Sequence, residues 1–170
     1  EFFVRAPLKL LIQLPNSANA LALSDQLYAV PENLAHPLTR RARPNDLLAA
    51  IGYGIDMFDC VIPTRYARSA TVFTARGRIR LTNRRYRRDA FPIDPSCDCE
   101  ACAGGFSRAY LHHLFAANEV LSAILCSMHN VRFYVRLMER AREAIAQDAF
   151  EAFRTEFLAE YDRNDGKSGE

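Results

Sequence analysis

Apolar residues recur at helical spacing through the carboxyl-terminal part of the chain. Between Arg108 and Met128 they line one side of a predicted helix, and His129 with Asn130 is expected to end it. The whole region 107–161 is predicted to be helical, and the polar residues 162–170 predict a frayed tail. The apolar side consists of Ala109, Leu111, Leu114, Phe115, Leu121 and Leu125.

The middle of the chain alternates between short helical and extended patterns. Pro44 opens a predicted helix that runs through Ile51, and the glycines at 52 and 54 end it. The apolar run 55–62 then predicts a buried strand, which Pro63 stops. Strands that alternate with helices in this way are typical of α/β folds.

Asp59 lies near the carboxyl end of this apolar run. Barrels and open α/β sheets place reacting groups at that end of their strands. The residues alone leave two interpretations open, a catalytic carboxylate and a buried structural one. Asp56, on the other face of the predicted strand, is expected to be a surface charge.

The net charge of +2 conceals a strong asymmetry. Residues 61–88 contain nine arginines and no acidic residue, and part of this charge falls on a hairpin predicted for 72–81 with its turn at 75–77. Such a segment favours a phosphate-rich partner, namely nucleic acid. The alternative is a solvated arginine face balanced by acids of the carboxyl-terminal helices, which are Glu139, Glu143, Asp148, Glu151, Glu156 and Glu160.

Three closely spaced cysteines and one histidine form a candidate metal site. Cys97, Cys99 and Cys102 can be presented by one tight loop, and His129 would be the fourth ligand of a structural Zn²⁺. His112 and His113 are rival ligands, but a ligand so early in the helix would require the chain to bend back at once. A disulfide or free thiols are the alternatives, and the five cysteines are too sparse for a disulfide-rich domain.

Length and composition set further limits. The 170 residues, 49% hydrophobic and 25% charged, are enough for one core but fewer than the ~250 of a complete eight-stranded barrel. No apolar stretch reaches the length of about 20 residues that spans a membrane. We therefore expect a soluble, cytoplasmic protein without a membrane partner.

Several strings occur in an order that resembles the tRNA-guanine transglycosylase family, also called queuine tRNA-ribosyltransferases. They are GIDMFDCVIPTR at 54–65, the cysteine cluster, and SRAYLHHL at 107–114. His129-Asn130, Phe133-Tyr134 and Leu137-Met138 extend the resemblance, which covers about residues 31–161. The strings at 58–60 and 63–65 are similar to the bacterial and eukaryotic branch.

The resemblance implies exchange of guanine at the wobble position of certain tRNAs for a 7-deazaguanine base. Asp59 matches the nucleophile, which would hold the ribose covalently between the two steps. Arg65, Arg68 and Arg43 match positions that grip the anticodon loop. The cluster of Cys97, Cys99, Cys102 and His129 is implied to be a structural zinc site, and the active form a homodimer.

The implied fold class is α/β, namely the C-terminal part of a TIM (β/α)8 barrel with an inserted zinc-binding subdomain and C-terminal helices. The expected domains are an atypical segment at 1–30, the last barrel units at 31–95, the zinc subdomain and helices at 96–161, and a polar tail at 162–170. The family's second catalytic aspartate has no counterpart here, and the glycine-rich strand that touches the base is replaced at 38–42 by LTRRA.

Three functional hypotheses follow from this comparison. The first is that the chain is the C-terminal portion of a transglycosylase, with its chemistry residing in the complete enzyme. The second is a non-catalytic, zinc-braced tRNA-binding or partner module in which Asp59 is dispensable. The third is a purely structural protein, against which the acid-free arginine segment argues.

Overall fold

The structure, a computed structural model, describes residues 43–165 and the side chains of residues 43–161. The expectations for residues 1–30 and for the segment 38–42 lie outside this range. The chain divides into two compact units, Glu1–Cys60 and Val61–Glu170, and each is described by itself. In neither described part is there a helix long and apolar enough to cross a membrane.

The first unit contains the predicted helix after Pro44. Helix α3 spans Pro44–Gly52 and begins with proline in its first turn, where a missing N–H costs nothing. The Asp46 carboxylate accepts a hydrogen bond from the backbone N–H of Arg43 at 3.2 Å. Gly54 ends the turn after the helix with a φ of +85°, a conformation that favours glycine.

The predicted buried strand at 55–62 is not formed. Residues 55–61 have no regular secondary structure, Asp59 is exposed, and helix α4 already begins at Ile62. A parallel strand receives its hydrogen bonds from neighbouring strands. The described residues supply no such neighbour, because their sheet consists of two strands from the second unit. Pro63 therefore lies in the first turn of a helix and does not end a strand.

The second unit begins with helix α4, Ile62–Arg68, and the predicted hairpin. Strands β1, Thr71–Thr74, and β2, Gly77–Arg80, pair in antiparallel register with Thr74 opposite Gly77. Gly77, which follows the two-residue turn between the strands, has a φ of +108°, a conformation that favours glycine. The hairpin prediction is confirmed.

Two short helical segments follow the hairpin. The 3-10 helix η1 spans Arg84–Arg88 and packs against helix α6, Arg108–Ala116. Helix α5, Glu100–Ala103, directly follows Cys99 and contains Cys102. The cysteine segment is therefore a loop that closes into one helical turn.

The single helix predicted over 108–128 is two helices. Helix α6 ends at Ala116, Asn118 takes a left-handed φ of +58°, and helix α7 then runs from Val120 to Ala146. Asparagine tolerates this conformation at a helix end. His129 consequently lies in the middle of α7 and does not mark its end.

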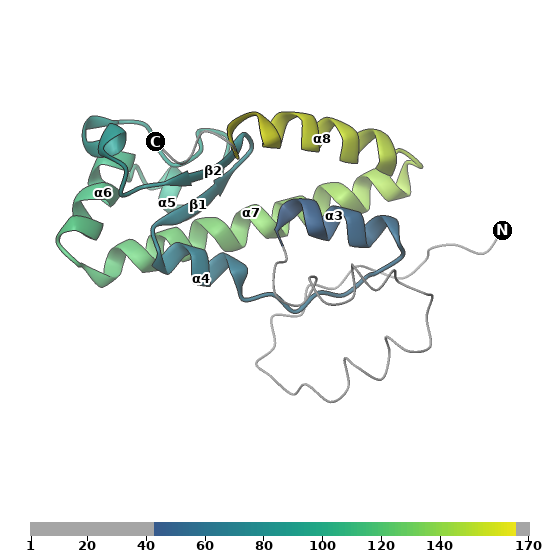
Figure 1. Ribbon diagram of the computed structural model, residues 1–170, viewed down its shortest axis with the longest axis horizontal. Helices are drawn as coiled ribbons and strands as arrows, with labels where there is room; N and C mark the ends of the chain where they lie inside the picture. The colour runs from purple at the N-terminus through teal and green to yellow at the C-terminus, as the bar shows by residue number, and fades with distance from the viewer. Residues whose placement is uncertain (1–42, 166–170) are drawn as a thin grey trace. The chain divides into compact units, whose positions relative to one another are not determined.

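Helix α8 spans Phe150–Asp165, so the first residues of the predicted polar tail are helical. Within the second unit α7 is the longest element, and α4, α5 and β1 all pack along it (Figure 1). An aromatic cluster joins α4, β1, α7 and α8. Its members are Tyr66, Phe73, Phe133, Tyr134, Phe157 and Tyr161.

One hydrophobic core connects the hairpin, the cysteine loop and the helices of the second unit. Val72, Leu81, Ile93 and Leu111 are fully buried in it. Cys99, Cys102 and Cys126 belong to the same core. The second unit is thus an α/β unit in which the candidate metal ligands are part of the packing.

Candidate metal centre

Three chain segments bring the four predicted ligands together. Cys97 and Cys99 come from the loop before α5, Cys102 from α5 itself, and His129 from the middle of α7. Their ligand atoms all lie within 4.8 Å of one another. Cys99, Cys102 and His129 are buried, and Cys97 is half-buried.

The histidine ring is oriented for metal binding. Its Nδ1 lies 3.5 Å from the Sγ of Cys99 and 3.3 Å from that of Cys102. A tetrahedral zinc ion with ordinary bond lengths would set a nitrogen and a sulfur ligand about 3.5 Å apart. On the far side of the ring, Nε2 lies 2.7 Å from the carbonyl oxygen of Phe73. A carbonyl only accepts, so Nε2 carries a hydrogen, and Nδ1 is the ring nitrogen that would bind a metal once its own proton is displaced.

The thiols and the imidazole share protons in this cluster. Hydrogen bonds from Cys102 and Cys99 lower the pKa of the Cys97 thiol, and the same contacts raise the pKa of Cys102. Burial opposes a charged His129, but hydrogen bonds to Cys97, Cys99 and the Phe73 carbonyl raise its pKa to about 9. A cation that binds thiolates and a neutral imidazole would replace these protons.

Cys126 is excluded from the ligand set. It lies on α7 and is completely buried in the apolar core. Burial raises the pKa of its thiol to about 12, so it stays protonated at neutral pH. It therefore serves as packing, as a small apolar side chain would.

The two rival histidines, His112 and His113, are not part of the cysteine cluster. His112 Nδ1 lies 2.8 Å from the carbonyl oxygen of Leu81 and ties the end of β2 to α6. His113 is exposed on α6. Only His129 has a ring nitrogen in the cysteine cluster of the described residues.

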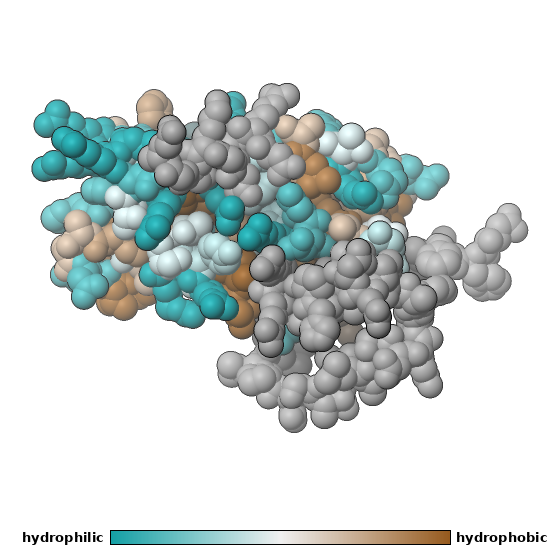
Figure 2. All heavy atoms as spheres, viewed as in Figure 1, coloured by the Kyte–Doolittle hydropathy of each residue, from teal (hydrophilic) through white to brown (hydrophobic). Residues whose placement is uncertain are grey.

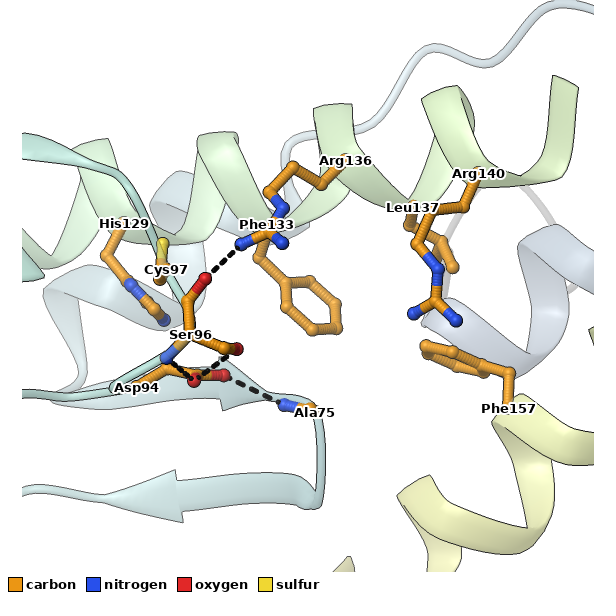
Figure 3. A pocket seen from close by; sticks show the side chains of 10 residues that line it. All are labelled: Ala75, Asp94, Ser96, Cys97, His129, Phe133, Arg136, Leu137, Arg140 and Phe157. Carbon is orange, nitrogen blue, oxygen red and sulfur yellow. Dashed lines mark hydrogen bonds between the residues drawn. The ribbon is translucent and has the colours of Figure 1, made fainter. Parts of the chain in front are cut away.

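Polar contacts hold the cysteine loop on α7. Arg132 donates to both carboxylate oxygens of Asp98, at 2.8 and 2.7 Å. Arg136 donates to the carbonyl oxygen of Ser96 at 2.7 Å, as Figure 3 shows. Arg132 and Arg136, one turn apart on α7, therefore bind Asp98 and Ser96, the residues on either side of Cys97.

Asp94 shapes the entry to the loop. One carboxylate oxygen accepts from the N–H and the hydroxyl of Ser96, and the other accepts from the N–H of Ala75 at 3.1 Å (Figure 3). Burial works to raise the pKa of Asp94, but these hydrogen bonds lower it on balance. The carboxylate thus fixes both the turn before Cys97 and the tip of the hairpin.

The paired glycines after α5 are needed for the turn. A Cβ on Gly104 would lie 2.4 Å from the carbonyl oxygen of Glu100, which is impossible without a shift. Gly105 has a φ of +82°, a left-handed conformation. The chain can therefore reverse at once from Cys102 into α6.

The pocket in Figure 3 lies beside this cluster, with Cys97 and His129 in its wall. Its volume is about 60 Å³. Pockets that bind drug-sized ligands usually measure about 300 to 1,000 Å³. A purine base does not fit here, so this pocket is not the base-exchange site.

Of the remaining predicted residues, Arg65, Arg68 and Asp59 are exposed, and Arg43 is half-buried. Arg65 and Arg68 are exposed on α4, three residues apart and thus on one side of the helix. Arg43, in the first unit, directly precedes α3. Asp59 is exposed in the irregular segment of that same unit.

Sequence reasoning did not identify Asn130 as important. It is fully buried; its Oδ1 accepts from the N–H of Phe73, and its Nδ2 donates to the carbonyls of Pro63 and Thr71. The sequence places this asparagine directly after the candidate ligand His129, but it does not show that the amide is buried or which groups it bonds. The role of Asp94 could have been found from the sequence, because Asp94-Pro95-Ser96 is a typical turn sequence directly before Cys97.

Comparison with a family model and with individual known proteins gives the same family in each case. A family model described as queuine tRNA-ribosyltransferase matches residues 19–163, a wider range than the 31–161 expected. A protein of that name from Herpetosiphon aurantiacus is 46% identical over 132 residues, which cover 78% of this chain and 33% of the relative. A second, from Solidesulfovibrio magneticus, is 47% identical over 139 residues, covering 82% of this chain and 37% of the relative.

A third relative of the same name, from Methylibium petroleiphilum, is 50% identical over 117 residues, 69% of this chain and 31% of the relative. The chain thus spans about a third of the length of the curated relatives it matches. The family match includes the segment of Asp59 and all four residues of the metal cluster. The chain belongs to the queuine tRNA-ribosyltransferase family.

Proposed function

We propose that the complete protein exchanges guanine at the wobble position of certain tRNAs for a 7-deazaguanine base, and that this chain supplies its C-terminal portion. The family match over residues 19–163 is the observation that carries the proposal. The curated relatives are about three times as long as the matched segment. The chain would thus be the last part of a (β/α)8 barrel together with its metal-binding unit and C-terminal helices.

Asp59 is the proposed nucleophile. A carboxylate oxygen attacks C1′ of the ribose, the bond from C1′ to N9 of guanine breaks, and guanine leaves with the electron pair and takes up a proton. The incoming base then attacks C1′ from the opposite side and loses its proton. The bond from C1′ to the Asp59 oxygen breaks, which regenerates the carboxylate and leaves the ribose with its original configuration.

An exposed Asp59 in an irregular segment is compatible with this role. In the complete protein, neighbouring barrel strands would hydrogen-bond to residues 55–61 and fix the carboxylate at the end of a strand. The apolar residues of this segment, Ile55, Met57 and Phe58, are of the type that such a strand buries. The strand would then form only with its neighbours present.

Arg65, Arg68 and Arg43 are proposed contacts to the anticodon loop. Arg65 and Arg68 present two guanidinium groups on the same exposed side of α4. A guanidinium binds phosphate in a bidentate manner and can also stack on bases. The match of Arg43 rests on the family resemblance alone.

The metal is proposed to be Zn²⁺ in a closed structural site. Three cysteines and a histidine are a common zinc set, and all four positions are protein ligands, so none remains for a substrate. Exposed apolar residues near the start of α7, among them Val120 at 72% and Ile124 at 49%, suit a subunit contact in a homodimer. As an enzyme acting on tRNA, the protein is proposed to be cytoplasmic.

A chimera tests the proposal. Residues 31–161 replace the matching segment of the Herpetosiphon aurantiacus relative, and incorporation of labelled guanine into a guanine-bearing tRNA is measured. The chimera should exchange guanine, and Asp59→Asn should abolish exchange while tRNA binding is retained. Asp56→Asn, three residues away, is the matched control and should stay active within a few-fold.

The second candidate is the non-catalytic partner module. The replacement of the family's glycine-rich strand by LTRRA at 38–42, with Arg65 and Arg68 retained, favours it. It predicts that the chimera binds tRNA but exchanges no guanine whatever residue occupies position 59. Exchange that survives Asp59→Asn would contradict the proposed nucleophile in either case.

A further inference from the structure

Helix η1 presents four exposed arginines around one buried ring. Arg84, Arg85, Arg87 and Arg88 are exposed, whereas Tyr86 in their middle is only 6% exposed. The Arg85 guanidinium lies over the Tyr86 ring, with its carbon 4.7 Å from the ring centroid. Figure 2 shows hydrophilic side chains projecting from the end of the unit that carries α6, the helix against which η1 packs.

The backbone that carries these arginines is held firmly. The Asp89 carboxylate, directly after η1, pairs with Arg108 of α6 at 3.0 Å, and Arg108 also donates to the carbonyl of Ile93. The backbone N–H of Ala109 donates to the Asp89 carbonyl at 2.8 Å. With Tyr86 buried and the backbone after it bonded to α6, the four exposed arginines lie on a fixed support.

The acidic helices do not neutralise this group. Glu139 pairs with Arg132 and Glu151 with Arg154, each within the helical part of the unit. Asp98 also pairs with Arg132. Among residues 43–161 no carboxylate forms an ion pair with any of the four arginines of η1. The described acids of the C-terminal helices therefore make no direct ion pair with the arginines of η1.

We infer that the arginines of η1, together with the exposed Arg80 at the end of β2, bind the phosphodiester backbone of tRNA as a contact additional to the proposed anticodon-loop residues. The inference rests on the proposed function, because tRNA is the polyanion that function supplies. The contact would be independent of base sequence and would strengthen binding and orientation of the RNA.

The spacing and chemistry of the group favour a nucleic acid strand. A 3-10 helix rises about 2 Å per residue with three residues per turn, so Arg84 and Arg87 form one pair about 6 Å apart, and Arg85 and Arg88 another. Neighbouring phosphates along a strand have a comparable separation. Arginine binds phosphate through a planar pair of N–H groups. The single apolar ring of η1 points inward, so the segment has no apolar face for a membrane.

The test measures binding of an unmodified tRNA transcript to the zinc-loaded 170-residue chain across a salt series. Two double variants, R84Q/R85Q and R87Q/R88Q, each remove two positive charges. R142Q/R154Q removes the same charge from α7 and α8 and is the matched control. All variants are first checked for zinc content and helicity. The η1 arginines and Arg142 are exposed, and Arg154 is half-buried and pairs with Glu151 of its own helix, so each should be replaceable without unfolding.

Each η1 variant should bind about tenfold more weakly at 0.1 M salt, and the slope of log K against log salt should fall by about 1.5, as for two lost phosphate contacts. The control should stay within about twofold. Equal weakening of the control, unchanged binding by the η1 variants, or no salt-dependent binding by the unaltered chain would each overturn the inference. Guanine exchange by the chimera reports on the proposed function separately.

Discussion

His129 donates its Nε2–H to the carbonyl oxygen of Phe73 over 2.7 Å, while its Nδ1 faces the cysteine sulfurs. The residue that completes the metal cluster thus also binds the edge of β1 that faces away from β2. Its neighbour Asn130 accepts from the N–H of the same Phe73. Two consecutive residues of α7 therefore satisfy a strand edge that would otherwise be open, and the metal site and the hairpin stabilise one another.

Replacing His129 by cysteine should separate these two roles. Sγ is one bond closer to the backbone than Nδ1, and a zinc–sulfur bond is longer than a zinc–nitrogen bond, so four thiolates can still bind Zn²⁺. The carbonyl of Phe73 would lose its partner. We expect one zinc ion per chain, measured by native mass spectrometry, and a free energy of unfolding in urea lowered by roughly 2 kcal/mol.

His129→Ala, which removes both roles, should lose zinc as well as stability. Cys126→Ala should retain zinc, since Cys126 is a packing residue outside the cluster. An unchanged stability of His129→Cys would show that the bond to Phe73 contributes little, and loss of zinc from Cys126→Ala would contradict the assigned ligand set.

Replacing Asn130 by alanine should destabilise the unit without removing a metal ligand. The change removes the hydrogen-bond partner of the buried Phe73 N–H and Pro63 carbonyl, and of the partly buried Thr71 carbonyl. Each such group costs about 1 to 3 kcal/mol, so we expect a loss of roughly 3 kcal/mol or more in urea unfolding of the zinc-loaded chain.

The matched control is Thr155→Ala. This exposed hydroxyl donates to the carbonyl of Glu151 within α8, and its loss should change the free energy of unfolding by less than about 0.5 kcal/mol. A loss below about 1 kcal/mol for Asn130→Ala would contradict the role assigned to this amide in bracing β1.

The local elements that rest on neighbouring residues were predictable from the sequence. The helix after Pro44 and the hairpin at 72–81 depend on proline, glycine and alternating apolar residues, and both are present. The cysteine spacing identified the three loop residues that gather around His129. These features are determined by short-range chemistry.

Features that depend on distant residues were not predictable in this way. The run 55–62 has the composition of a buried strand, but a strand needs neighbours that the described residues do not provide. No proline or glycine marks the break between α6 and α7 at Asn118, and the helical spacing of apolar residues continues across it. The pattern therefore predicted one helix where there are two. The bonds of Asn130 join residues 57 to 67 positions apart, a relationship that no local pattern reports.

We propose that Asp59 becomes covalently attached to the ribose of the wobble nucleotide. The most direct test is to incubate the chimera with a guanine-bearing tRNA in the absence of free base. A covalent protein–RNA adduct is then detected on a denaturing gel. The chimera should form an adduct that free guanine discharges, Asp56→Asn should form it equally, and Asp59→Asn should form none while still binding zinc and tRNA. An adduct that persists in Asp59→Asn would contradict the account.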